Sequence, residues 1–461
     1  MTEECAVESY CPPWNAPAIE SSRRGRRRIV SLIFVVYGLL IFEGALRKWI
    51  FPQFQKELFF IRDPFVFAIY FLCIKHRVRT RHALFIVTAV VMAWLTGLLV
   101  LLEIASGMLT SGTHLQLAIY GWREYFLNIP LAFVIGECVS REDLKRLVKY
   151  TLLVSIPIAI LSIFQSSAPA SAVINAGTAI DPSNTFSPMA VELGFNRTSG
   201  TFTSNEGQAL FIGSIVAMLL WVWILPRRRR PVKGAVLLVA TAAVITNLAV
   251  SGERTAFVMS IIIASAALMG AALMKSGKDS LRNLRMPIVL VTVGVLAAPL
   301  VFPDHLHALS IRAANAAEGD ARYSYGIVHR ALGDFTRFTD LVFDSPVLGY
   351  GLGFAGNASS RVGLALPFYE DDWSRNIVDL GVVLGVIFII FRVTLVLWLI
   401  AGAVASTRRR NDALPLLLVG FIGVILLNGQ ITGQGTVNGY AWLFAGFCIA
   451  TIRTGEEETG L

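Results

Sequence analysis

The chain has 461 residues, of which 55% are hydrophobic and only 15% are charged. A soluble globular domain carries about a quarter charged residues, so this composition excludes an ordinary soluble fold. The formal net charge of +9 requires no nucleic-acid partner, because membrane topology and attraction to anionic lipid headgroups account for it.

Long apolar runs follow one another from near residue 29 to near residue 452. They do not alternate as the strands of a membrane barrel do, and a lipid-facing backbone must satisfy its own hydrogen bonds, so helices are expected. We predict an all-α, polytopic membrane protein with about twelve transmembrane helices. Its transmembrane domain, 29–452, lies between cytoplasmic tails at 1–28 and 453–461. The expected spans are 29–46, 58–74, 83–102, 117–136, 147–164, 206–225, 234–250, 255–274, 286–302, 376–400, 413–427 and 438–452.

Lys and Arg side chains cluster in every second connection. The positive-inside rule places such connections in the cytoplasm, which also puts both termini there. The clusters are Arg23 to Arg28, Lys75 to Arg81, Arg141 to Lys149, Arg227 to Lys233, Lys275 to Arg285 and Arg408 to Arg410.

Two connections on the opposite, external side are long, at about 165–205 and 303–372. The second separates the ninth and tenth spans and is the largest soluble part of the chain. It contains a Gly-x-Gly-x-Gly pattern at 349–353. The pattern follows no soluble strand, so a tight turn is a better interpretation than a dinucleotide site.

Charged residues in or beside the spans share the external side, with Arg392 as the deeper exception. Charges at such positions are costly and point to function by default. Arginine forks match phosphate oxygens, and helix starts add backbone donors, so the pattern favours capture of an anion. The candidate ligand-binding residues are Arg47, Lys48, Arg62, Arg123, Glu124, Arg197, Asn205, Glu206, Arg254 and Arg375.

The alternative is that these charges neutralise one another. Glu43 with Arg47 is one helical turn apart, and Arg62 with Asp63 and Glu253 with Arg254 are adjacent pairs. For the sites in the first four spans, pairing and ligand binding are equally good interpretations.

Candidate general bases are the carboxylates Glu370 and Asp372 and the imidazole of His329, with Arg330 beside it as a substrate contact. The histidine spacings in the 303–372 loop fit no metal site, and no nucleotide-binding loop is present. The sequence therefore predicts neither a metal nor a cofactor.

Four stretches resemble the O-antigen ligase and O-antigen polymerase family of bacterial envelope glycosyltransferases. Asn196 to Glu206 is similar to the family's Arg-x-x-Gly-x-Phe entry into a helix, and Ser251 to Ala256 to its Ser-x-x-Arg-x-Ala turn. Asp344 to Gly353 is similar to its Pro-Leu-Leu-Gly-x-Gly element, and Asn376 to Gly385 to the helix that closes the large loop.

The resemblance implies a GT-C-like membrane fold and transfer of a glycan from undecaprenyl pyrophosphate to an acceptor glycan or glycolipid, on the periplasmic face of the bacterial inner membrane. It implies that Arg197 and Arg254 hold the pyrophosphate. Ligases of the family carry a histidine just before the closing helix, where this chain has Asp372 to Asn376. That departure favours a polymerase or a divergent transferase, with Arg375 in a cationic role.

Two rival classes follow from the same residues. A transporter or flippase of lipid-linked glycan predicts charges and broken helices near the midplane, which the one-sided charge distribution opposes. A non-catalytic membrane assembly protein would need no convergent arginines.

Overall fold

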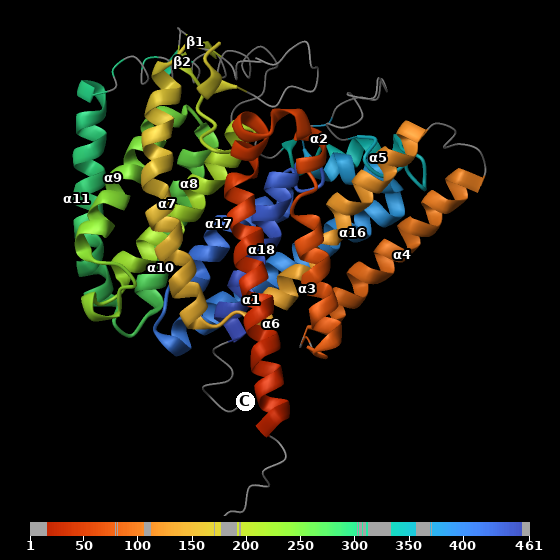
Figure 1. Cartoon of the computed structure of the whole chain (residues 1–461), viewed down its shortest axis with the longest axis horizontal. Helices are drawn as coiled ribbons and strands as arrows, with labels where there is room; N and C mark the ends of the chain where they lie inside the picture. Colours follow the sequence, from red (N-terminus) through yellow and green to blue (C-terminus); the bar gives the residue numbers. More distant parts are fainter. Residues whose placement is uncertain are drawn as a thin grey trace, which may run out of the picture.

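The structure is a computed structural model that describes residues 16–78, 80, 82–105, 112–169, 171–176, 191–192, 195–301, 303, 307, 310–311, 333–355, 369 and 371–453. Over these residues the chain is a bundle of helices (Figure 1). The only strands described are the two-residue β1 (Val191–Glu192) and β2 (Phe195–Asn196), which pair antiparallel.

Eight helices of the described chain are long and apolar enough to cross a membrane. The chain is therefore a multi-pass membrane protein. The eight are Arg24–Ile50, Ala83–Ala105, Arg141–Ser167, Asn205–Ile224, Gly234–Ser251, Arg254–Leu273, Asp372–Arg410 and Gly435–Arg453.

Each of the twelve expected spans falls on a helical segment, although the count of twelve crossings stays a prediction. The segments are α1 (Ala16–Ala45) continued by the π-helix η2 (Leu46–Ile50), α2 (Gln55–Leu58), α3 (Asp63–Lys75), α4 (Ala83–Ala105), α5 (Gly112–Trp122), the π-helix η4 (Arg123–Leu127), α6 (Ile129–Cys138), α7 (Arg141–Ser167), α8 (Asn205–Ile224), α9 (Gly234–Ser251), α10 (Arg254–Leu273), α11 (Gly277–Val301), α14 (Phe338–Asp344), α16 (Asp372–Arg410), α17 (Leu414–Asn428) and α18 (Gly435–Arg453).

The centre of the bundle is formed by α8, α17 and α18. The most apolar windows of α8 and α18 are 94% buried, whereas that of α4 is 17% buried and α4 lies at one edge (Figure 1). Glycines allow α6 and α18 to approach closely, since a Cβ at Gly136 would meet Ile449 and one at Gly446 would meet Ile135. Small residues let membrane helices approach closely, so that van der Waals contacts hold them together where the hydrophobic effect cannot.

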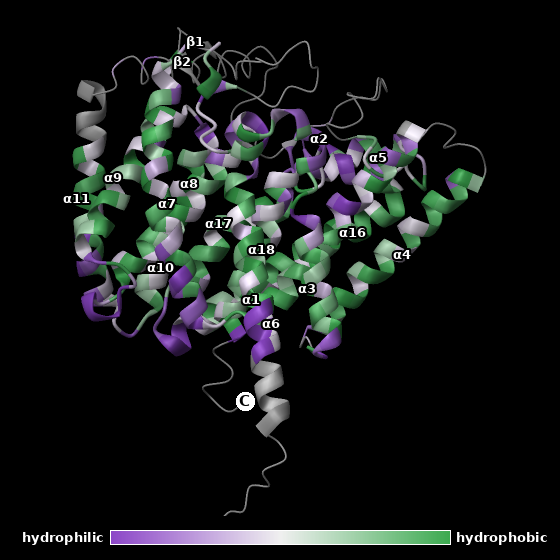
Figure 2. Cartoon of the chain, viewed as in Figure 1, coloured by the Kyte–Doolittle hydropathy of each residue, from purple (hydrophilic) through white to green (hydrophobic). Residues whose placement is uncertain are grey.

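The basic connections meet at one end of the bundle, which we call the basic end. Arg26 donates to the Cys138 carbonyl at 2.8 Å, and Arg141 pairs with Asp412 at 2.6 Å. Asn411 also bonds Ser276. Hydrophilic residues gather toward this end and toward the opposite end, with hydrophobic residues between them (Figure 2).

The opposite end, which we call the polar end, carries the buried charges. It is defined by Lys48 where α1 finishes, Arg62 where α3 begins, Arg197 before α8 and Arg375 in α16. These charges, which the sequence predicts to share one side of the membrane, thus lie at one end of the bundle.

The expected single helix at 376–400 is wrong, because α16 is broken at Gly381. Gly381 has φ 78° and ψ 173°, a conformation that only glycine adopts readily. The break folds the arm at 372–380 back along the arm that follows. A Cβ at Gly385 would meet the Asn376 carbonyl oxygen at 2.7 Å, so this second glycine allows the two arms to touch.

The Gly-x-Gly-x-Gly segment is the tight turn that the sequence predicts. Gly349, Gly351 and Gly353 all have positive φ. The turn sits against the break in α16, where Tyr350 N donates to the Val378 carbonyl at 2.8 Å. Ala355 N donates to the Asp379 carboxylate at 2.7 Å, so the turn and the broken helix hold each other in place.

Candidate functional site

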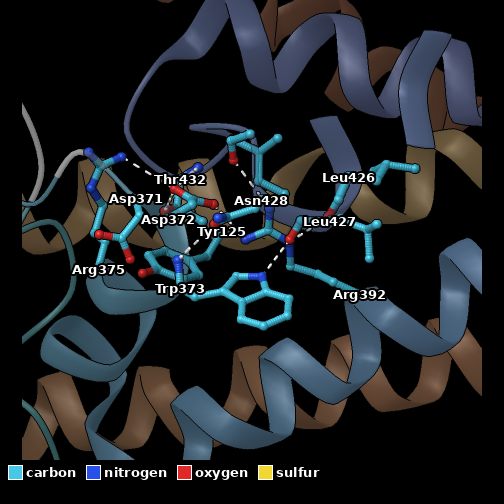
Figure 3. A network of polar contacts seen from close by, with 12 residues as sticks. Tyr125, Asp371, Asp372, Trp373, Arg375, Arg392, Leu426, Leu427, Asn428 and Thr432 are labelled. Atoms are coloured by element: carbon cyan, nitrogen blue, oxygen red, sulfur yellow. Dashed lines mark hydrogen bonds and ion pairs between the residues drawn. The ribbon is translucent and has the colours of Figure 1, made fainter. Parts of the chain in front are cut away.

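A buried ion cluster lies where the two arms of α16 meet the end of α17 (Figure 3). Asp372, Arg375 and Arg392 are each 0% exposed. The Asp372 carboxylate pairs with Arg392 at 2.5 Å and with Arg375 at 3.3 Å. In a straight helix, twenty residues would separate the Cα atoms of Asp372 and Arg392 by about 30 Å, so the break at Gly381 creates this cluster.

Backbone carbonyls accept from further donors of both arginines. Arg392 donates to Leu426 O at 2.7 Å and Gly429 O at 3.2 Å, and Arg375 donates to Tyr369 O at 2.8 Å. Thr432 donates its hydroxyl to Asp372 at 2.7 Å. The deeper charge on Arg392 is thus neutralised inside the protein, as a charge within a membrane segment must be.

A second ion network joins α1, α3 and η4. Arg62 pairs with Glu43 at 2.8 Å, and Arg47 pairs with the same Glu43 carboxylate at 3.2 Å. Arg123 grips Asp63 with two nitrogens, at 2.5 and 2.9 Å, and also pairs with Glu124. The predicted Glu43–Arg47 pair is confirmed. The predicted Arg62–Asp63 pair is wrong, because Arg62 pairs with Glu43 and Asp63 with Arg123, each across to another helix.

The π-helical turns η2 and η4 hold several of these charges. All five residues of η4, Arg123 to Leu127, are buried, and η2 carries Arg47 and Lys48. π-helical turns inside longer helices occur frequently at functional sites. The turn η2 begins where the expected span 29–46 ends, and η4 interrupts the expected span 117–136 between α5 and α6.

The segment 429–438, which joins α17 to α18 and includes the first turn of α18, links the two networks. Sequence reasoning missed it. Its Thr432 bonds Asp372, and its Gly435 carbonyl accepts from Arg62 at 3.0 Å. Asn438 donates to the Glu124 carbonyl. A Cβ at Gly433 would collide with the Arg375 guanidinium. The available signal was a run of Gly, Gln, Thr and Asn between two short apolar spans.

Lys48 is buried against the turn that precedes α8. Its ammonium donates to Ser199 Oγ and to Gly200 O, both at 2.9 Å. Gly200 has φ 53°, and Gln165 brackets the same turn by bonding Gly200 N and O. Lys48 therefore holds the Asn196–Glu206 stretch, and all of its partners there are neutral.

Arg197 and Arg254 belong to neither of these two ion networks. The Arg197 side chain is 31% exposed, and its one carboxylate partner, Glu253, is 3.7 Å away. Arg254 is exposed and forms no ion pair with any described residue. The predicted Glu253–Arg254 pair is thus wrong, because Glu253 faces Arg197 across the 251–254 turn.

Buried polar atoms beside Arg197 lack partners within the described chain. Arg197 Nε and Asn205 Oδ1 are buried and accept or donate no hydrogen bond there, which is uncommon in folded proteins. Glu206 lies within electrostatic reach of Glu253 and Arg375. The Arg197 region thus adjoins the buried ion cluster, and we call Arg197, Asn205, Glu206, Glu253 and Arg254 the outer arginine site.

The predicted site residues fall into three groups. Arg47, Arg62, Arg123 and Glu124 form one ion network, and Arg375 and Asp372 form another. Arg197, Arg254, Asn205 and Glu206 form the outer arginine site, with Lys48 beneath its leading turn. His329, Arg330 and Glu370 lie outside the described residues.

The sequence predicts that Arg123, Arg197, Arg254 and Arg375 converge on one external-facing, partly polar cavity roofed by the 303–372 loop, and the structure does not place all four in such a cavity. Arg375 is 0% and Arg123 is 8% exposed, and each is held by carboxylates in a separate network. Only Arg197 and Arg254 are accessible. The reason is that a guanidinium inside the bundle needs an anion beside it, and the chain supplies that anion for the deeper two.

One apolar groove lies between α3, α4 and η4. Its volume is about 470 Å³, and its lining includes Phe67, Trp94, Leu98 and Phe126. It shares no residue with the outer arginine site. Among the described residues, no group of three His, Cys, Asp or Glu side chains is placed to hold a metal ion.

Burial raises the pKa of the Tyr369 phenol, helped by the nearby Tyr350 and the carboxylates of Asp371 and Asp344. The backbone carbonyl of the same residue accepts from the Arg375 guanidinium.

No protein-family model, curated protein or solved structure matches this chain.

Proposed function

We propose that the protein is a glycosyltransferase of the O-antigen polymerase or ligase type. It would transfer a glycan from undecaprenyl pyrophosphate to an acceptor glycan or glycolipid, within a GT-C-like fold in the bacterial inner membrane. The observation that supports this is the sorting of the cations at the polar end. Of Arg123, Arg197, Arg254 and Arg375, only Arg197 and Arg254 are accessible and incompletely neutralised by carboxylates of the described chain. They belong to two of the four stretches that carry the family resemblance.

The chemistry is displacement at the anomeric carbon. An acceptor hydroxyl attacks that carbon, the bond to the pyrophosphate oxygen breaks, and the hydroxyl proton passes to a base. Negative charge grows on the departing pyrophosphate, where Arg197 and Arg254 would stabilise it without a metal. Asn205, at the start of α8, and the first amides of that helix would offer further polar contacts to the anion.

The geometry changes which carboxylate is the best base. Two guanidinium groups and the Thr432 hydroxyl hold the Asp372 carboxylate, and Asp372 is fully buried, so an acceptor hydroxyl cannot reach it. Glu253 is the carboxylate beside Arg197, and Glu206 lies within electrostatic reach of Glu253. We therefore favour one of these two over Asp372 for the proton transfer.

The test is reconstitution with a lipid-linked oligosaccharide and an acceptor. Arg197→Ala and Arg254→Ala should each lower the transfer rate about a hundredfold, as loss of one transition-state donor does. Arg→Lys should restore little, because an ammonium cannot reproduce the guanidinium fork. Arg409→Ala removes an equally exposed arginine at the basic end and should leave the rate unchanged. Folded Arg197→Ala and Arg254→Ala proteins that match the parent rate would refute the proposal.

A transporter of the same lipid is the second candidate, because α16 is broken at Gly381 and discontinuous helices are typical of secondary transporters. The same vesicles separate the two. Movement of the lipid across the bilayer with its pyrophosphate intact would favour transport, whereas release of undecaprenyl pyrophosphate together with a longer or transferred glycan supports the transferase.

The transferase proposal also requires the polar end to face the periplasm and the basic end the cytoplasm. In a cysteine-free background, a cysteine at Ser310 should react with an impermeant maleimide in cells with a permeabilised outer membrane. A cysteine at Arg229, in the exposed turn η6 (Arg227–Arg229) of the basic end, should react only after the inner membrane is opened. The reverse pattern would exclude this orientation.

A further inference from the structure

A large cleft opens at the basic end, far along the helices from the outer arginine site. Its volume is about 1140 Å³. It lies between the 226–234 connection and the first two turns of α11. The lining residues used below are Trp223, Arg227, Arg230, Lys233, Leu238, Asp279, Arg282 and Met286.

The cleft carries an excess of positive charge. Four of its lining side chains are cationic, and one, Asp279, is anionic. Asp279 is already paired with Arg282 at 3.2 Å. Arg227, Arg230 and Lys233 form no ion pair with any described residue, so three positive charges face the same space without an anion.

Arg230 is held in a fixed position. Its guanidinium donates to Leu225 O at 3.1 Å and Trp223 O at 3.0 Å, and it stacks 5.0 Å from the centre of the Trp223 ring. Trp223 is itself fixed by a bond to Thr241 at 3.1 Å. Burial and the neighbouring Arg227 charge lower the pKa of Arg230, although an arginine remains charged at neutral pH. An anion in the cleft would relieve both effects.

The membrane side of the cleft is apolar and open. Leu238 on α9 is 41% exposed and Met286 on α11 is 45% exposed. Both sit in helices that carry the apolar spans, with Val239 and Ile288 exposed next to them. A ligand held by the three cations would therefore place any hydrocarbon portion against these side chains.

We propose that this cleft binds an anionic phospholipid, with the phosphate between Arg227, Arg230 and Lys233 and the acyl chains along Leu238 and Met286. Basic pockets between membrane helices on one face of the bilayer bind such headgroups. A nucleotide or a free phosphate would use the cations and leave the exposed apolar wall unused. The proposal is independent of glycan transfer, because it concerns the opposite end of the molecule.

The test is lipid binding by the purified, delipidated protein. The probe is phosphatidylglycerol added to protein in phosphatidylcholine nanodiscs, with bound lipid counted by native mass spectrometry. Arg227→Gln/Lys233→Gln should weaken binding roughly thirtyfold, since each cation near a lipid surface contributes about a factor of five to ten. Arg230 is left in place because it also caps backbone carbonyls.

The matched control is Arg408→Gln/Arg409→Gln, which removes the same charge from exposed positions of the same end outside the cleft. It should bind as the parent does. Equal weakening in the two variants would mean a diffuse basic surface and would overturn the site. Displacement of the lipid by inorganic phosphate at constant ionic strength would show that a free phosphate is the ligand, and would overturn the lipid assignment. Leu238→Gln should weaken lipid binding and leave phosphate binding unchanged.

Discussion

Two sets of arginines at the polar end differ in how the protein treats their charge. Arg375 and Arg392 are fully buried around Asp372, whereas Arg197 and Arg254 are accessible with one distant carboxylate between them. Both sets satisfy the rule that charges in membrane segments are functional candidates. The rule therefore finds two kinds of site. They differ in how completely carboxylates and carbonyls of the protein surround each guanidinium.

The reason is energetic. A guanidinium taken out of water costs several kcal/mol unless anions and carbonyls replace its hydration. The chain provides that replacement for the buried set through a broken helix and a carbonyl-lined turn, which are expensive to build. It does not provide it for the outer set, and water or a ligand must do so. A guanidinium held by carboxylates and carbonyls of the protein thus indicates a structural role. A guanidinium that lacks such partners indicates a place for an anion.

The largest effect should come from Asp372→Asn. The substitution keeps the shape but leaves the guanidinium groups of Arg375 and Arg392 without a carboxylate. Breaking one buried pair costs about 3 to 5 kcal/mol. Loss of both pairs should therefore abolish folding or lower the melting temperature by about 6 to 10 degrees, at roughly one degree per kcal/mol for a chain of this length. Fluorescence-detected size exclusion after heating measures this.

Asp371→Asn is the control, because the Asp371 carboxylate caps the arm by accepting from Ser374 N at 2.9 Å and pairs with neither guanidinium. Asn caps a helix about as well as Asp, so this change should cost less than about 1 kcal/mol. If Asp372→Asn is as stable as Asp371→Asn, then Asp372 is available for chemistry, and the contrast between the two arginine sets does not hold.

The next effect is expected at Arg123. Arg123→Ala leaves Asp63 and Glu124 without their common partner, at a cost of about 3 kcal/mol given the partial exposure of Asp63. The double variant Arg123→Ala/Asp63→Ala should be more stable than the sum of the two single variants predicts, by about 1 to 2 kcal/mol. Additive losses in that double-mutant cycle would show that Arg123 binds something other than Asp63.

The sequence predicts the helical membrane architecture well, because apolar length and basic loops are local signals. The shared end of the basic connections and the tight turn at Gly349 to Gly353 also follow from local rules. Partner choice does not. Asp63 pairs with Arg123 instead of its neighbour Arg62, and Glu253 pairs with Arg197 instead of Arg254, because contacts between helices decide these pairs.

The break in α16 and the 429–438 connection were the other omissions. Gly381 sits in an apolar run that reads as one helix, and a single internal glycine is tolerated in membrane helices. Only the docking of the 346–353 turn against it shows why it must have positive φ. The connection at 429–438 carries no charge, so a search for charged residues passes over it.

A third prediction concerns Gly381 itself. Gly381→Ala should destabilise the protein by about 2 kcal/mol, from strain at φ 78° and from collision of the new Cβ with the Val347 carbonyl. Gly38→Ala is the matched control, since a Cβ at Gly38 of α1 meets nothing within 4 Å. That control should be neutral or stabilising by up to about 1 kcal/mol. Equal effects of the two changes would mean that α16 is continuous and that Asp372 and Arg392 are apart.

The smallest effect on stability should come from the outer arginine site. Arg254→Ala removes an exposed side chain with no ion pair to any described residue and should change the free energy of unfolding by less than about 0.5 kcal/mol. Arg197→Ala loses only a pairing at 3.7 Å and should cost about 1 kcal/mol at most.

Added inorganic pyrophosphate should raise the melting temperature of the parent, as any ligand of the folded state does, and should not raise that of the Arg197→Ala/Arg254→Ala protein. A melting temperature that collapses in either single variant, as in Asp372→Asn, would place these residues among the structural charges. If Arg197 and Arg254 are dispensable for folding but required for the rise in melting temperature with pyrophosphate, their role is to bind a ligand.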